Sequence, residues 1–284
     1  MEPFIQTKGL PVRLQLEPWQ EYTEITAGFT GRQGGAGKAP YDSFNCAFHV
    51  GDDPEDVLSN RRLLAESLGF SLEDWTCGEQ THGKHIAVVT AAGRGRGSRD
   101  RASAFQSTDG LLTNVPGVLL TSFYADCVPL YFYDPVQRAA GLAHAGWKGT
   151  VAEIAGAMVE QMAESYGSRP GDILAAIGPS IGDCCYEVDD FVMNPVRALE
   201  DTLPEPASAE AAPLLYSLSQ SAKDKRMLNL KEMNRRIMIK AGILPTHIEC
   251  TTWCTSCNPD VFFSYRKEQG VTGRMTSWIG IKES

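Results

Sequence analysis

The chain has 284 residues, of which 43% are hydrophobic and 21% charged, and its formal net charge is −9. That composition is typical of a globular protein with a developed core, and the negative charge argues against nucleic-acid binding, which depends on contacts from lysine and arginine to phosphate. No apolar run approaches the roughly 18 residues that a membrane span needs, and residues 1–8 lack the features of a secretion signal, so we expect a cytoplasmic protein without membrane partners.

The first strongly marked element is a helix that begins after Asp53. Asp53 is a typical N-cap, Pro54 suits the first helical position, and Gly69 is a typical stop. The helix places Asn60 and Arg61 in its middle. Its predicted buried face consists of leucines, namely Leu58, Leu63, Leu64 and Leu68.

An arginine-rich stretch follows, with four arginines between Gly93 and Arg101. The pattern is typical of a mobile solvated loop. It could also steer an anionic substrate toward the protein.

Apolar runs then predict the remaining elements. Strands are expected at residues 86–89, 118–125, 130–133, 139–143, 173–177, 248–253 and 262–265, with residues 126–129 as a tight link between the second and third. Helices are expected at residues 149–165 and 228–241, and residues 203–213 form a proline-rich surface connection between helical segments. Since strands and helices do not strictly alternate, we expect an α+β fold. We expect one domain over residues 1–284, in which helices flank mixed β-sheets as a layered α/β/β/α-type sandwich.

The eight cysteines are expected to be reduced, because the chain is long and carries no secretion signal. Cys254-Thr-Ser-Cys257 resembles half of a zinc knuckle, but no second pair follows downstream, and the adjacent Cys184 and Cys185 are a poor partner. A separate structural zinc site is therefore not expected.

Three segments each place a metal-competent side chain beside glycine or at the end of an expected strand. They contain His82, Cys127 and His144, separated by 45 and 17 residues. Each residue alone is a weak signal, because single histidines and cysteines are more often structural than metal ligands. The spacing matches no local metal signature.

Their surroundings resemble the YfiH/YlmD laccase-domain family. Gln80-Thr-His-Gly83, Asp126-Cys-Val-Pro129 and His144-Ala-Gly-Trp-Lys-Gly149 are similar to that family's blocks Q-x-H-G, D-C-x-P and H-A-G-W-[KR]-G. The resemblance continues at residues 108–111, 177–188, 262–267 and 272–274, in order between Asn45 and Ile281. Such an ordered series is far more specific than any one block.

The resemblance implies that His82, Cys127 and His144 are metal ligands and catalytic residues. Two imidazoles and one thiolate leave a fourth position open, which is the pattern of catalytic zinc. Zinc is therefore the expected cofactor, with copper as the alternative, and zinc can lower the pKa of bound water to about 7.

The resemblance also implies phosphorolysis of adenosine, inosine or methylthioadenosine, with adenosine deamination as a side activity. The expected partners are a nucleoside and phosphate, and the chain is expected to be a monomer or a homodimer. Candidate substrate and phosphate contacts are the amides of residues 178–182 and the side chains of Asn45, Arg61, Lys148, Ser180 and Arg266. The three cationic side chains could equally form surface ion pairs. The family often has a cysteine at Ser180 and a leucine at Cys46.

Other functions use the same residues. A cysteine-dependent hydrolase would use Cys127 as nucleophile with His144 or His82 as base, for example on a cell-wall substrate. A cell-wall editing or quality-control protein would use the metal only to hold its fold. A copper polyphenol oxidase is a weak alternative, because five histidines are too few for a trinuclear cluster.

The acid or base for deamination is not indicated by a motif. The H-x-E and P-C-x-x-C motifs of zinc nucleobase deaminases are absent in working order. Asp109 and Asp126 are the nominated carboxylates. His49 lies in a family-like block, and it either lines the pocket or is structural.

Overall fold

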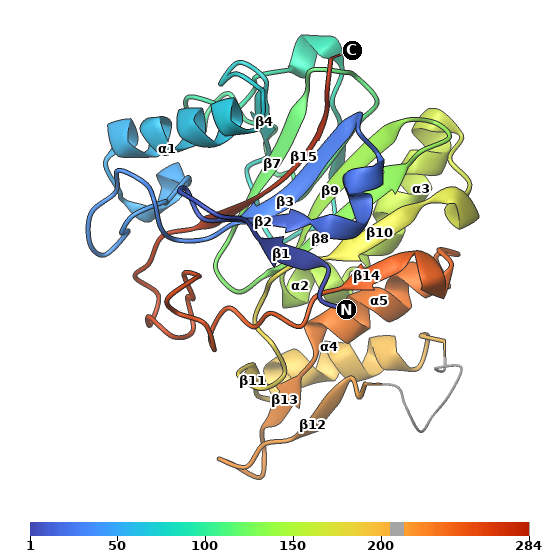
Figure 1. Ribbon diagram of the computed structural model, residues 1–284. Helices are drawn as coiled ribbons and strands as arrows, with labels where there is room; N and C mark the ends of the chain where they lie inside the picture. The colour runs from blue at the N-terminus through green and yellow to red at the C-terminus, as the bar shows by residue number, and fades with distance from the viewer. Residues whose placement is uncertain (205–212, 284) are drawn as a thin grey trace.

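The computed structural model describes residues 1–204 and 213–283. Within them, two six-stranded mixed sheets pack face to face (Figure 1). The first sheet contains, in order, β1 (Phe4–Gln6), β2 (Arg13–Leu16), β3 (Ile25–Thr30), β15 (Met275–Ile281), β7 (Leu119–Tyr124) and β4 (Trp75–Cys77). The second contains β14 (Ile248–Cys250), β10 (Leu174–Ile177), β8 (Val128–Asp134), β9 (Ala139–Ala145), β6 (Gly110–Thr113) and β5 (Ile86–Val88).

Helices cover the outer faces of the two sheets. On the first sheet lies α1 (Pro54–Ser67), and on the second lie α2 (Trp147–Val151), α3 (Ile154–Tyr166) and α5 (Leu230–Lys240). A three-stranded sheet of β11 (Glu187–Val188), β13 (Arg226–Leu228) and β12 (Tyr216–Leu218) lies beside α4 (Asp190–Glu200). The expected α+β architecture with α/β/β/α layers is confirmed.

Strand β8 shows how the sequence alternation builds these layers. Leu130 and Phe132 point toward α3 and α5, whereas Tyr131 and Tyr133 point into the core between the sheets. Successive side chains of a strand face opposite sides, so a central strand covered on both faces must be apolar throughout. Each such buried side chain contributes about 1.5–3 kcal/mol relative to an exposed one.

Helix α1 begins as expected and buries Leu64 as predicted, but part of its buried face is polar. The Asp53 carboxylate accepts a hydrogen bond from the Glu55 amide at 2.9 Å, which caps the helix. Leu63 is 40% exposed, contrary to the prediction, whereas Asn60 and Arg61 are buried. The polar side chains take the inner face because the loops beneath α1 present carbonyl groups that need donors.

Several expected boundaries are wrong. Strand β8 begins at Val128, inside the expected link at residues 126–129, and because β7 and β8 belong to different sheets, residues 125–127 cross from one sheet to the other. The helix expected at residues 149–165 is two helices, since Glu153 takes a left-handed φ of 59° between α2 and α3. Residues 262–265 form no strand but lead into turns, and Leu228 ends β13 instead of beginning a helix.

The arginine-rich stretch is tied down by contacts, in contrast to the expected solvated loop. Arg94 pairs with Asp74 and Glu283, Arg99 with Glu73, and Arg101 with Glu79. The guanidinium of Arg96 stacks 4.1 Å from the ring centroid of Phe105.

In the described part of the chain, no helix combines the length and apolarity needed to cross a bilayer.

The expected surface connection at residues 203–213 lies largely outside the described residues. Helix α4 ends before it, and the next described element is strand β12, not a helix.

Arg61 ties α1 to the loops beneath it. Its Nε donates to the Cys46 carbonyl at 2.8 Å, and its Nη1 donates to the carbonyls of Gly97 and Ser98 at 2.7 and 2.9 Å. The guanidinium also lies 4.2 Å from the ring centroid of Phe48. Within the described residues no carboxylate pairs with Arg61, so it is not the surface ion pair considered above.

We predict that Arg61→Met lowers the free energy of unfolding by about 3–5 kcal/mol, because three enclosed carbonyls lose their donor. Chemical denaturation measures the loss. Arg62→Met, at the exposed neighbouring position of the same helix, is the matched control and should change stability by less than about 0.5 kcal/mol. Equal effects of the two substitutions would show that Arg61 has no structural role.

Candidate active site

The three predicted ligands converge from three separate segments. His82 lies in the loop between β4 and β5, Cys127 in the crossing between the sheets, and His144 near the end of β9. Their donor atoms all lie within 4.8 Å of one another. The Cys127 Sγ is 3.9 Å from His82 Nε2, and the two imidazole rings meet edge to face at 4.8 Å between centroids.

The backbone around the ligands is unusual in two ways. His82 and Asp126 both have left-handed φ angles, 61° and 91°, which side-chain-bearing residues rarely adopt. At Gly146, a Cβ would lie 2.9 Å from His82 Cδ2 and 3.0 Å from Cys127 Sγ, so only glycine fits beneath the cluster. Backbone conformations of this kind persist where the surrounding structure enforces them, and they concentrate at functional sites.

Asp109 organises the two histidines. Its Oδ1 accepts from His144 Nδ1 and from the His82 amide, both at 2.9 Å. Its Oδ2 accepts from the amides of Thr81 and Gly83 at 3.1 and 2.7 Å. With Nδ1 of His144 engaged, Nε2 of that ring is directed at the cluster, which is the carboxylate–histidine arrangement found behind metal ligands.

The charges of the cluster reinforce one another. Burial opposes ionisation of Cys127, but the neighbouring His144 and His82 lower the pKa of its thiol to about 6. Burial also opposes protonation of His144, yet Cys127 and Asp109 raise its pKa to about 9. The thiolate form, which is the form that binds metals, is therefore favoured before any metal arrives.

Asp126 joins the crossing to two other segments. Its Oδ1 accepts from Thr255 Oγ1 and its Oδ2 from the Arg266 amide, both at 2.7 Å. Asp109 and Asp126, the two nominated acid–base carboxylates, are thus both engaged in holding the site together.

The donor set fits a tetrahedral metal ion with one open position. Ideal zinc–nitrogen and zinc–sulfur bonds of about 2.0 and 2.3 Å place donors about 3.5 Å apart, close to the 3.9 Å between Cys127 and His82. Within the described residues, no fourth histidine, cysteine or carboxylate joins the group. Three protein ligands with an open position are characteristic of catalytic and not structural zinc.

The cluster opens into a pocket of about 790 Å³, within the range of small-molecule sites. Five cationic side chains line it, against the two acidic residues Glu79 and Asp126. The cations are Arg61, Arg101, Lys148, Arg266 and Arg274. In a chain of net charge −9, this concentration makes the pocket attractive to anions.

The structure separates the predicted substrate contacts into two groups. Arg61, Lys148 and Arg266 line the pocket, and within the described residues neither Lys148 nor Arg266 pairs with a carboxylate. Asn45 and Ser180 do not line it. The Asn45 side chain bonds to Ala47, Asp52 and the Arg274 amide and so shapes its loop, whereas Ser180 is fully buried and its hydroxyl has no hydrogen-bond partner among the described residues.

Sequence reasoning missed Arg274 and Arg101 as pocket residues and left His49 open. His49 lines the pocket, where desolvation and the charges of Arg274, Arg101 and Arg61 lower its pKa to about 4. Arg274 and Tyr186 stand in the family-like blocks at residues 272–274 and 177–188, and Arg101 ends the arginine-rich stretch considered for steering an anion, so each had a signal in the sequence.

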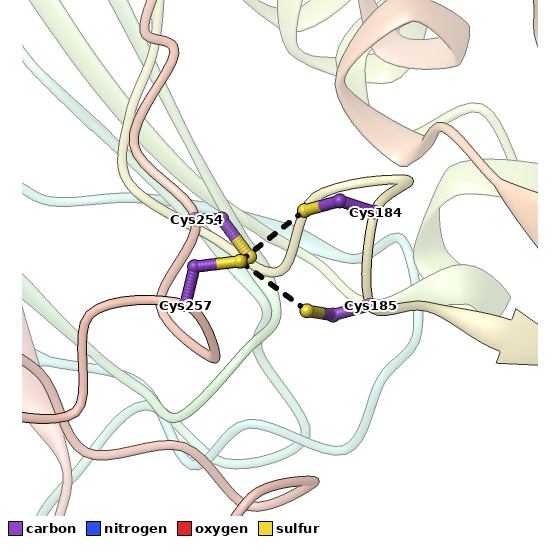
Figure 2. Close-up of side chains that lie close together, drawn as sticks. All are labelled: Cys184, Cys185, Cys254 and Cys257. Atoms are coloured by element: carbon purple, nitrogen blue, oxygen red, sulfur yellow. Dashed lines mark hydrogen bonds between the residues drawn. The ribbon is translucent and has the colours of Figure 1, made fainter.

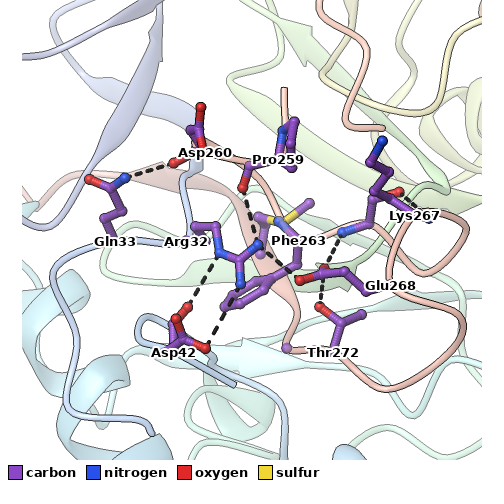
Figure 3. Close-up of polar contacts among 12 residues, drawn as sticks. Arg32, Gln33, Asp42, Pro259, Asp260, Phe263, Lys267, Glu268 and Thr272 are labelled. Carbon is purple, nitrogen blue, oxygen red and sulfur yellow. Dashed lines mark hydrogen bonds and ion pairs between the residues drawn. The ribbon is translucent and has the colours of Figure 1, made fainter. Parts of the chain in front are cut away.

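The loop that carries Tyr265 and Arg266 is anchored away from the pocket by Arg32 (Figure 3). Arg32 Nη1 donates to the Pro259 carbonyl at 3.1 Å and to Glu268 Oε1 at 2.9 Å. Its guanidinium lies 4.6 Å from the ring centroid of Phe263. Arg32, just after β3, thus holds this loop on both sides of Tyr265 and Arg266.

Comparisons with known proteins show which proteins this chain resembles in sequence and in fold. Residues 26–282 match the family model described as multi-copper polyphenol oxidoreductase laccase. The purine nucleoside phosphorylase YlmD of Bacillus subtilis strain 168 is 44% identical over 278 residues, 96% of each chain. The crystal structure of YlmD from Geobacillus stearothermophilus gives a TM-score of 0.90 at 44% identity, covering 99% of this chain and 100% of that one. For the hypothetical protein YfiH of Bacillus licheniformis these values are 0.89, 41%, 98% and 99%.

We predict that Asp109→Asn weakens metal binding at the cluster by about 10- to 100-fold, because His144 loses its orienting carboxylate. Metal protects a ligating thiolate from alkylation. The zinc concentration that half-protects Cys127 from iodoacetamide, followed on its own peptide by mass spectrometry, therefore reports this site alone.

Asp190→Asn, which alters an exposed carboxylate paired with Arg197 on α4, is the control and should leave the protection curve unchanged. A wild-type protection curve for Asp109→Asn would contradict the role assigned to Asp109.

Proposed function

Because this chain belongs to the YlmD/YfiH family, whose family model is the multi-copper polyphenol oxidoreductase laccase model, we propose that it is a purine nucleoside phosphorylase. The substrates proposed are adenosine, inosine and methylthioadenosine, split by phosphate into the free base and ribose 1-phosphate or its methylthio form. The observation that carries the proposal is that the open three-ligand centre and five cationic side chains line the same pocket. The name carried by its relative in Bacillus subtilis supports it.

Phosphate is assigned to the side of the pocket formed by Lys148 and Arg266. The Lys148 ammonium is exposed and lies 5.7 Å from the Trp147 ring centroid. Arg266 uses one nitrogen to reach the Glu187 carbonyl at 2.9 Å, which leaves other donors of its planar guanidinium for an anion. Arg274 adds a third positive charge to the pocket.

The nucleoside base is assigned to the aromatic part of the pocket, whose lining includes Phe48, Tyr186 and Tyr265. His49 remains neutral at pH 7, since its pKa is lowered to about 4. A neutral imidazole can both donate to and accept from a purine. Burial raises the pKa of the Tyr186 phenol, so Tyr186 keeps its proton and can donate it in a hydrogen bond.

The reaction needs one bond formed and one broken. A phosphate oxygen bonds to the ribose C1′ while the C1′–N9 bond breaks, and the bonding electrons leave with the purine, which takes up a proton. Positive charge grows on the ribose as the base departs, and the phosphate held by Lys148 and Arg266 is the counter-charge beside it. Hydrogen bonds from Tyr186 or His49 to the purine ring stabilise the departing base.

We assign zinc to the His82, Cys127 and His144 centre, with copper as the alternative that the same donors can bind. A bound zinc ion acts as a Lewis acid that polarises an oxygen or nitrogen atom of the substrate or of water. The residues of the chain hold that position through Asp109 and leave one side of the centre open.

Adenosine deamination is proposed as a slower side reaction in the same pocket. Water adds at C6 of the purine and ammonia leaves, which requires a group that moves protons between them. Asp109 and Asp126 are both engaged in structural hydrogen bonds, so neither is placed to serve as well as a dedicated glutamate.

The alternative functions make different demands on the same residues. A cysteine-dependent hydrolase needs Cys127 as a free nucleophile with His82 or His144 as its base, and the same contacts serve that role, so the metal content of the protein separates the two functions. A purely structural metal would call for a fourth protein ligand, and none joins the group within the described residues. A multicopper oxidase needs a trinuclear cluster, for which His49, His85 and His247 are the only other histidines in the sequence.

We predict that the metal-quantified protein converts inosine to hypoxanthine and ribose 1-phosphate only when phosphate is present. Chromatography of the products with and without phosphate measures this directly. His144→Ala, which removes a proposed ligand, should abolish turnover, and Ser180→Ala, outside the pocket lining, should retain it. Absence of turnover with a fully loaded centre would remove phosphorolysis and favour the hydrolase or cell-wall editing function.

We further predict that Arg266→Met raises KM for phosphate by about 10- to 100-fold, the effect of losing one or two hydrogen bonds to a charged group. The KM for the nucleoside should change much less. Lys267→Met removes the neighbouring positive charge, which does not line the pocket, and serves as the control. Equal changes in the two KM values would contradict the assignment of Arg266 to phosphate.

A further inference from the structure

A second group of metal-competent side chains lies outside the three-ligand centre. The thiols of Cys184, Cys185, Cys254 and Cys257 converge from two loops, with all four sulfur atoms within 4.8 Å of one another (Figure 2). Cys257 Sγ lies 3.5 Å from Cys184 Sγ and 3.4 Å from Cys185 Sγ. None of the four is in a disulfide.

The spacing matches a single tetrahedral ion. Zinc–sulfur bonds of about 2.3 Å place the sulfur atoms of a tetrahedral site about 3.8 Å apart, and the separations of 3.5 and 3.4 Å from Cys257 Sγ lie within about 0.4 Å of that value. A disulfide would need about 2.05 Å between two sulfur atoms and would leave the other two thiols without a role.

The loops are shaped to bring the thiols together. Cys184 and Cys185 lie in a tight turn in which the amides of Cys185 and Tyr186 both donate to the Gly182 carbonyl at 3.0 Å. In such a turn two adjacent side chains can point the same way, which they could not do in a strand. Figure 2 shows both thiols directed at Cys254 and Cys257.

Gly182 adds two features that favour a ligand role for Cys254. Its amide donates to Cys254 Sγ at 3.2 Å, an interaction that stabilises a thiolate and orients it. A Cβ at Gly182 would lie 3.1 Å from Cys184 Sγ and 3.3 Å from Cys254 Cβ, so any side chain there would crowd the group.

We propose that Cys184, Cys185, Cys254 and Cys257 form a second, structural zinc site with four thiolate ligands. The proposal departs from the expectation from sequence, which found no second pair downstream of Cys254-Thr-Ser-Cys257 and judged the adjacent Cys184 and Cys185 a poor partner. The partner pair lies some 70 residues upstream, and the parallel bridge between Ser180 and Cys254 brings it into place. With four protein ligands the site is closed, in contrast to the open three-ligand centre.

The second site holds one wall of the pocket. Ile181 and Tyr186, which flank Cys184 and Cys185, both line the pocket. The Ile181 amide donates to the Asp126 carbonyl at 2.9 Å, and Thr255, next to Cys254, donates to the Asp126 carboxylate. Zinc at the four cysteines thus joins the loops of Ile181 and Thr255, which both contact Asp126, the neighbour of Cys127. The second site acts on the pocket only by positioning these loops.

The test is the metal content of the full chain, purified under reducing conditions and measured by elemental mass spectrometry. Wild type is expected to hold about two zinc ions per chain, and Cys184→Ser combined with Cys257→Ser about one. Both of these cysteines are exposed, so the substitutions spare the core. Cys257→His, which keeps a ligand, should retain about two. Cys250→Ser, a partly buried thiol outside both groups, is the matched control and should also retain about two.

A second measurement does not depend on the stability of those variants. In Cys127→Ser protein, where the three-ligand centre is impaired, the zinc X-ray absorption spectrum should show four sulfur ligands at about 2.3 Å. Zinc content of the double variant equal to that of Cys250→Ser, a zinc environment of nitrogen and oxygen in Cys127→Ser, or a disulfide among the four cysteines would overturn the proposal. None of these results depends on phosphorolysis, so the second site and the proposed function succeed or fail separately.

Discussion

The buried carboxylate of Asp109 is the contact on which the rest of the site depends. It is only 3% exposed, and it accepts hydrogen bonds from His144 and from three successive amides of the loop that carries His82. An isolated buried carboxylate would be strongly unfavourable, whereas one with this many donors holds its charge. The Asp109 carboxylate therefore fixes the tautomer of His144 and the left-handed backbone of His82. The two segments that carry these histidines, far apart in sequence, become one donor set.

The packing of two sheets supplies the third ligand and the pocket. Because β7 and β8 belong to different sheets, the chain must cross between them, and Cys127 lies on that crossing beside His82 and His144. Asp126 then connects the crossing to the loops that carry Ile181, Thr255 and Arg266. Four-cysteine zinc on one side and Arg32 on the other would hold those loops at a fixed distance from the centre, so that the cations of the pocket face an anion without having to reorganise.

Local signals in the sequence predicted what depends on local physics. The capped helix after Asp53, the apolar run of β8 at residues 130–133 and the α+β class follow from capping and periodicity. Long-range choices could not be predicted in this way. Nothing near residues 126–129 indicates that the link changes sheets, and nothing in α1 indicates that loop carbonyls will prefer Arg61 to Leu63. The sequence made Cys184 and Cys185 look a poor partner for Cys254 and Cys257, because an isolated bridge outside the strands brings the two pairs together. The ligands His82, Cys127 and His144 were identified through resemblance, because their spacing alone matches no signature.

The central claim is that the chain builds an open three-ligand metal centre inside a cationic pocket. Anomalous diffraction at the zinc absorption edge, on crystals of the protein as purified, tests it most directly. The account predicts a peak about 2.0–2.3 Å from His82 Nε2, Cys127 Sγ and His144 Nε2, with no fourth protein ligand. A peak closed by a fourth side chain, or crystals of active protein with no metal at this position, would contradict it.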